Sequence, residues 1–253
     1  MALTWIDFAF PGVPGVRCVF QTRQSGNSCG AWSCGNISLE VGDDPASAIS
    51  NRRQIAPDLG LTEWAELKQV HGDRIAFEPV PQAPDTAPVD EGDGLATARA
   101  GLGLVIKTAD CQPVLIAHRL GHHVAALHVG WRGNRIGFIA SGIRAFCHRY
   151  GLAPRDLLAV RGPSLGPALS EFVNFEGEWG DDFRHWFNQR DRTMNLWGLT
   201  RTQLEAAGLA SENIFSLDLC THSLVDSFFS YRRERTTGRQ ASVIWIKPPA
   251  AQA

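Results

Sequence analysis

The chain has 253 residues, of which 44% are hydrophobic and 20% are charged, a composition typical of a globular protein and not of a disordered one. Its formal net charge of −2 gives no sign of the basic surface that nucleic-acid binding needs. The N-terminus lacks the charged and apolar regions of a secretory signal, and no apolar run approaches the ~18 residues of a membrane span, so we expect a cytoplasmic protein with neither nucleic-acid nor membrane partners.

In chain order, the sequence first predicts a strand at residues 17–22 and then a helix that begins at 43–45, with its arginines on the outer face. A strand is predicted at 67–71, and the four prolines within 79–88 indicate an extended surface loop. The remaining predicted elements are strands at 103–107, 114–118 and 123–129, helices at 134–150, 177–189 and 200–207, and strands at 213–217 and 242–247. Strands and helices that mix without regular βαβ alternation favour an α+β fold.

Three segments share a layout in which an apolar run ends in a reactive side chain and a turn follows. They end at His71, at Asp110–Cys111 and at His128. One cysteine and two histidines can hold zinc and leave a fourth position for water or substrate. The spacing matches no compact zinc motif, however, and on spacing alone a buried cysteine with two structural histidines is the better interpretation.

The six cysteines do not form the pattern of a disulfide framework in a chain of this length. Without an export signal we expect the thiols to stay reduced. Cys29 and Cys34 in SCGAWSCG are close enough to pair, but we interpret them as loop thiols.

Motifs along most of the chain change the interpretation of the histidines. The strings LKQVHGD, VIKTADCQPV, ALHVGWRG, LDLCTHS and FFSYRRERTTGRQ resemble, in order, the motif series of the YfiH family, also called laccase-domain proteins or multicopper polyphenol oxidases. FQTRQSGNSCG and VGDDPASAISNRRQIA resemble its N-terminal pattern, so the resemblance covers about Val19 to Lys247.

The resemblance implies a single domain over residues 1–253 with a layered α/β/β/α core. It also implies a zinc ion held by His71, Cys111 and His128. The implied activities are phosphorolysis of purine nucleosides (adenosine, inosine, guanosine and methylthioadenosine) and deamination of adenosine, with a nucleoside and phosphate as the small-molecule partners.

Phosphorolysis needs an anion-binding pocket near the metal, and guanidinium groups match phosphate geometry. The candidates are Arg23, Arg132, Arg233 and Arg239, although a solvated turn is an equal interpretation of the last two. Asp110 could orient a metal ligand, carry a proton or simply form a strand-end turn. By analogy with an asparagine in the family's N-terminal loop, Asn36 is expected in the substrate pocket.

One segment departs from the family pattern. Where many members read GPCIGPCCYEVG, this chain reads GPSLGPALSEFV at 162–173, and an unusually aromatic stretch follows. If this segment lines the base pocket, nucleoside preference could differ or activity could be lost.

Two other functions stay open at this point. A copper-dependent phenol oxidase is one, because a Cys/His₂ site could take up copper. A conventional laccase, however, needs a trinuclear cluster built from paired H-x-H motifs, and this chain has eight histidines and no such pair. The other is a metal-binding protein without turnover. The sequence does not predict the oligomeric state.

Overall fold

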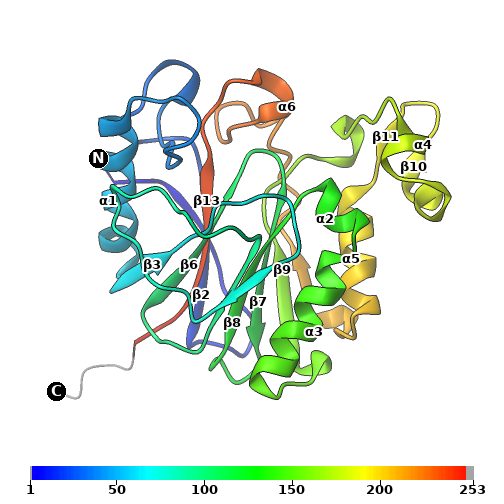
Figure 1. The fold of residues 1–253 in the computed structure, drawn as a ribbon, viewed down its shortest axis with the longest axis horizontal. Coiled ribbons are helices and arrows are strands. Elements are labelled where there is room, and N and C mark those ends of the chain that lie inside the picture. The colour runs from blue at the N-terminus through cyan, green and yellow to red at the C-terminus, as the bar shows by residue number, and fades with distance from the viewer. Residues whose placement is uncertain (1, 249–253) are drawn as a thin grey trace.

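Two mixed β-sheets face each other at the centre of residues 2–248, the part of the chain that the computed structural model describes (Figure 1). The first sheet has the strand order β1 (Trp5–Phe8), β2 (Val16–Gln21), β13 (Gln240–Ile246), β6 (Leu102–Thr108) and β3 (Glu63–Ala65). The second has the order β12 (Ile214–Ser216), β9 (Leu157–Arg161), β7 (Gln112–His118), β8 (Val124–Val129), β5 (Gly94–Thr97) and β4 (Ile75–Phe77). A small hairpin joins β10 (Phe187–Asn188) and β11 (Thr193–Met194).

Helices cover the outer faces of both sheets (Figure 1). The first sheet carries α1 (Pro45–Leu59), and the second carries α3 (Phe138–Tyr150) and α5 (Leu196–Ala206). Shorter helices are α2 (Trp131–Arg135), α4 (Phe175–Glu178) and α6 (Tyr231–Glu234). Short 3₁₀ helices occur at Gly30–Trp32, Pro154–Asp156, Pro167–Leu169, Asp181–Trp186 and Ser211–Asn213. No helix of the described residues has the length and apolarity to cross a membrane.

Alternation of side chains along the strands produces three apolar layers. In β6, Leu104 is buried between the two sheets, whereas its neighbour Val105 packs toward α1 with Ile55. In β7, Ile116 lies under α3 and contacts the cluster that contains Phe146. Burying each such aliphatic side chain contributes about 1.5–3 kcal/mol. The α+β prediction with an α/β/β/α core is therefore confirmed.

The helix α1 begins where the sequence predicts, because the Asp44 side chain accepts a hydrogen bond from Ser47 N at 3.0 Å. The expectation that its arginines face outward is wrong for Arg52, which is fully buried and forms an ion pair with Glu66 at 2.7 Å. Arg52 also donates to the carbonyl groups of Pro84 and Thr86, and this fixes the proline-rich loop against the helix.

Two predicted elements are wrong and one is divided. Residues 67–71 form no strand, since Lys68 makes a single bridge to Glu91 and the chain turns at His71 with φ +60°. The region 177–189 is broken into a 3₁₀ turn and a hairpin, because its aromatic residues pack into a separate cluster. The predicted helix 134–150 is divided at Gly137, whose φ of +74° separates α2 from α3.

Candidate metal centre and cavity

His71, Cys111 and His128 lie together although 40 and 17 residues separate them in sequence. His71 follows the first sheet's edge strand β3, Cys111 lies in the turn between β6 and β7, and His128 is in β8. Their ligand atoms all lie within 4.8 Å of one another, and His71 Nε2 is 3.7 Å from Cys111 Sγ. The loop after β3, the turn between β6 and β7, and strand β8 thus supply the three side chains.

Asp93, which sequence analysis missed, orients two of these residues. Its fully buried carboxylate accepts a hydrogen bond from His128 Nδ1 at 2.7 Å, so Nε2 is left as the ring atom free to bind a metal. The same carboxylate accepts from the backbone N–H of His71 at 2.9 Å and of Gly72 at 2.7 Å. Asp93 immediately precedes β5, a strand that the sequence pattern did not predict.

The protonation states of this cluster are coupled. Burial alone would raise the pKa of Cys111, but the charge of His128 and hydrogen bonds from both histidines lower it to about 6. Burial alone would lower the pKa of His128, but the Cys111 thiolate and the Asp93 carboxylate raise it to about 9. At neutral pH the metal-free pair is therefore a Cys111 thiolate beside a His128 imidazolium, and a metal that binds His128 Nε2 displaces its proton.

Gly130 lets the backbone pass directly beside the cluster. A Cβ atom at this position would lie 2.9 Å from His71 Cδ2 and 3.0 Å from Cys111 Sγ. Two imidazoles and a thiolate, one imidazole oriented by a carboxylate, form a donor set that fits a tetrahedral zinc ion with one position open. The three residues thus form a potential metal site.

A cavity of about 550 Å³ opens in front of the three residues. One part of its wall is polar and comes from Ser38, Glu40, Gln69 and Lys107. A second part is apolar and comes from Trp131, Leu165, Phe172 and Leu196. A third part comes from α6 and the residues after it, namely Tyr231, Arg232, Arg235 and Arg239. The divergent segment 162–173 therefore does reach the cavity, through Leu165 and Phe172.

Two of the expected arginines line the cavity. The guanidinium carbon of Arg132 lies 4.6 Å from the ring centre of Trp131, and the guanidinium group donates no hydrogen bond to any residue between 2 and 248. Arg239 is mostly buried, and burial lowers its pKa although the nearby Cys111 and Asp110 charges act in the opposite direction. Arg235, which sequence analysis did not single out, lies 5.5 Å from the ring centre of Tyr231.

Asp110 also lines the cavity, but both of its oxygens are engaged. Oδ1 accepts from the Thr221 hydroxyl at 2.6 Å, and Oδ2 accepts from the backbone N–H of Arg232 at 2.7 Å. The carboxylate therefore ties α6 to the turn that carries Cys111. This arrangement favours a positioning role over that of a proton carrier.

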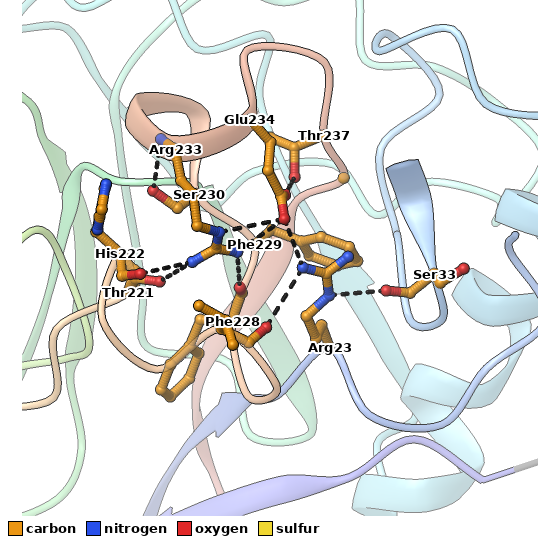
Figure 2. Close-up of polar contacts among 12 residues, drawn as sticks. Arg23, Ser33, Thr221, His222, Phe228, Phe229, Ser230, Arg233, Glu234 and Thr237 are labelled. Atoms are coloured by element: carbon orange, nitrogen blue, oxygen red, sulfur yellow. Dashed lines mark hydrogen bonds and ion pairs between the residues drawn. The ribbon is translucent and has the colours of Figure 1, made fainter. Parts of the chain in front are cut away.

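Arg23 and Arg233 do not reach the cavity, contrary to expectation. Both guanidinium groups lie 3.1 Å from the Glu234 carboxylate. Figure 2 shows how they converge on it. Arg233 donates further to the carbonyl groups of Thr221, His222 and Phe228, and Arg23 donates to Ser33 (Figure 2). Because these donors are occupied, the two arginines stabilise the position of α6. Neither guanidinium has two unoccupied nitrogens that could bind a phosphate together.

Asn36 lies behind the cavity wall and not on it. Its side chain is fully buried, accepts from the backbone N–H of Arg239 at 2.9 Å and donates to Asp43 at 2.8 Å. It therefore positions the backbone of Arg239, and the expected direct contact with substrate is not what the geometry offers.

Known proteins with similar sequences and structures identify the family. Residues 17–247 match the family described as multi-copper polyphenol oxidoreductase laccase. The chain belongs to this family. It is 32% identical over 250 residues to the purine nucleoside phosphorylase YfiH of Escherichia coli (strain K12), covering 94% of this chain and 96% of that protein.

Solved structures agree with the family assignment. The crystal structure of YlmD from Geobacillus stearothermophilus superposes with a TM-score of 0.83 at 28% identity, covering 96% of both chains. The Bacillus licheniformis hypothetical protein YfiH superposes with a TM-score of 0.82 at 30% identity, covering 92% of this chain and 93% of that one. The expected relation to the YfiH family is confirmed.

Proposed function

We propose that the chain is a zinc-dependent purine nucleoside phosphorylase whose reactive centre is formed by His71, Cys111 and His128. The observation that carries this proposal is the cavity, which joins a Cys/His₂ cluster, an aromatic wall and guanidinium groups in one space. Relatives of similar length that bear the name purine nucleoside phosphorylase support it. The proposed substrates are adenosine, inosine, guanosine and methylthioadenosine, each with phosphate.

Different cavity residues would bind the phosphate and the base during phosphorolysis. In this reaction a phosphate oxygen bonds to C1′ of the ribose while the C1′–N9 bond breaks, and the purine leaves with a proton. Arg132 and Arg239 would hold the phosphate. The Arg132 guanidinium has no hydrogen-bond partner among residues 2–248, and Arg239 uses only Nη1, on the carbonyl groups of Thr237 and Gly238, so its Nε and Nη2 remain as donors. Trp131 and Phe172, with ring centres 5.8 Å apart, would stack against the base.

The metal would be held by the two imidazoles and the thiolate. Bound zinc would supply a Lewis acid at the open coordination position. Asp93 would keep the His128 ring in the required tautomer, and Asp110 would hold the Cys111 turn against α6. We also propose that the same centre deaminates adenosine with water as the second reactant.

A copper-dependent phenol oxidase is the alternative that the family's description suggests. Among residues 2–248 one group of three histidine and cysteine side chains could hold a metal, and that is fewer ligands than a trinuclear copper cluster needs. Copper could still occupy a Cys/His₂ site, since it binds such ligands more tightly than zinc. Oxidation of phenols after copper loading would therefore not establish the physiological reaction.

One assay separates these functions. Zinc-loaded protein is incubated with adenosine or inosine, with and without phosphate, while free base and ammonia are followed beside a Cys111→Ala variant. We expect base release that requires both phosphate and Cys111. Turnover of phenols only after copper addition, with no base released, would support the oxidase, and no turnover of either kind would indicate a metal-binding protein without catalysis.

A further inference from the structure

The side chain of Glu40 lines the cavity, and one of its two carboxylate oxygens accepts no hydrogen bond from the described part of the chain. Glu40 lies in the loop between β2 and α1, and its side chain is 38% exposed. Oε2 contacts Lys107 Nζ at 3.0 Å, whereas Oε1 accepts no hydrogen bond from any residue between 2 and 248. Asp110 also lines the cavity, but its two oxygens are already engaged. Glu40 therefore offers an acceptor that a ligand can use.

A buried charge network holds this carboxylate in place. Lys107 is 5% exposed, and its ammonium group lies 3.0 Å from Glu40 and 2.9 Å from Glu66. Glu66 is fully buried and also contacts Arg52 at 2.7 Å. Gln69 fixes the backbone of Lys107 through two hydrogen bonds of 2.8 Å. Because the lysine is held from behind, Glu40 is oriented before any ligand arrives, and this lowers the entropic cost of binding.

The wall around Glu40 and Lys107 differs chemically from the rest of the cavity. Guanidinium groups suit phosphate and aromatic rings suit a base, but neither group is selective for hydroxyls. An ionised carboxylate accepts hydrogen bonds only, so its free oxygen is complementary to hydroxyl donors. Acidic side chains bind ribose hydroxyls in this way in dinucleotide-binding folds.

We propose that Glu40, held by Lys107, binds the ribose hydroxyls of the nucleoside and makes this site select ribonucleosides over 2′-deoxyribonucleosides. This inference rests on the proposed nucleoside phosphorylase function. The hydroxyls would donate to Oε1, while Oε2 stays on Lys107. A 2′-deoxynucleoside would lose a hydrogen bond to a charged acceptor, which is worth about a 10-fold to 100-fold difference in affinity.

The test compares wild type and Glu40→Gln with adenosine, 2′-deoxyadenosine and 3′-deoxyadenosine. Calorimetry measures the dissociation constants, and phosphate-dependent base release measures kcat/KM. Glu212→Gln is the matched control, because Glu212 is an exposed glutamate outside the cavity. Lys107 keeps its contact with Glu66 in the Glu40 variant, so we expect an unchanged unfolding midpoint.

We expect wild type and Glu212→Gln to bind adenosine roughly 10-fold or more tightly than 2′-deoxyadenosine. Glu40→Gln should lose most of that preference, because it weakens adenosine more than either deoxynucleoside. A wild-type preference below about threefold would overturn the role of Glu40, and this measurement does not depend on how the variant folds. An equal loss for all nucleosides in a variant with an unchanged unfolding midpoint would overturn it as well. If nucleosides bind with this preference but no base is released, the phosphorylase proposal is wrong, whereas the proposed binding of ribose hydroxyls by Glu40 is supported. If no nucleoside binds, both fail.

Discussion

Replacing Asp93 should weaken the metal site more than any other single change outside the three ligands. The carboxylate accepts hydrogen bonds from His128 Nδ1 and from the backbone N–H groups of Val70, His71 and Gly72. In Asp93→Ala all four donors lose their partner, and the ring of His128 loses the contact that sets its tautomer. Loss of such an outer partner typically lowers metal affinity 10-fold to 100-fold, or about 1.4–2.7 kcal/mol.

Stability should fall as well, because Asp93 is fully buried. Each buried donor left without a partner costs about 1–3 kcal/mol, and some of these groups will recover water in the cavity, so we expect a loss of about 2–4 kcal/mol. Metal affinity is measured by competition with a chromogenic chelator, and stability by urea unfolding of the metal-free protein.

The matched control is Asp90→Ala, an exposed aspartate in the same loop. We expect this variant to match wild type in both measurements. Asp93→Ala protein that binds zinc within about twofold of wild type would refute the reasoning, because the carboxylate would then contribute nothing to ligand orientation.

Three further changes test other parts of the structure. Gly130→Ala should displace His71 and Cys111 and so reduce metal content while the unfolding midpoint changes little, and full metal content would contradict the close approach. Arg52→Ala should lower the free energy of unfolding by about 3–5 kcal/mol, because buried Glu66 would lose one of its two cationic partners. A loss below ~1 kcal/mol would contradict this role of the ion pair. Glu234→Gln should weaken the ion pairs with Arg23 and Arg233 that hold α6, and so raise the phosphate KM severalfold at constant metal content. An unchanged KM would show that the position of α6 does not affect phosphate binding.

The central strands, which are long apolar runs, could be predicted from the sequence, and the short edge strands could not. The central strands β6, β7 and β8 are continuous apolar runs, and their predicted and observed bounds differ by no more than two residues. β3 and β4 have three residues each, too few for any periodicity to appear. The sequence predicts a helix at 177–189, but the aromatic residues there pack into a cluster of their own beside the cavity.

For the candidate site, the motifs in the sequence indicated the three metal ligands. They did not indicate which residues form hydrogen bonds or ion pairs with one another. Arg23 and Arg132 look alike in sequence, yet the first is bound to Glu234 and the second is free in the cavity. Asp93 and Glu40 carry no motif signal, since each acts through a residue far away in the chain. Such roles depend on long-range packing, which a single sequence does not specify.

The metal content of the purified protein tests the central claim most directly. We predict that zinc, measured by mass spectrometry of the metal-replete and dialysed chain, is present near one equivalent in wild type and near zero in Cys111→Ala, while both proteins unfold cooperatively. Wild-type protein that holds no metal after zinc loading, or a Cys111→Ala variant that holds as much as wild type, would contradict a metal centre at His71, Cys111 and His128.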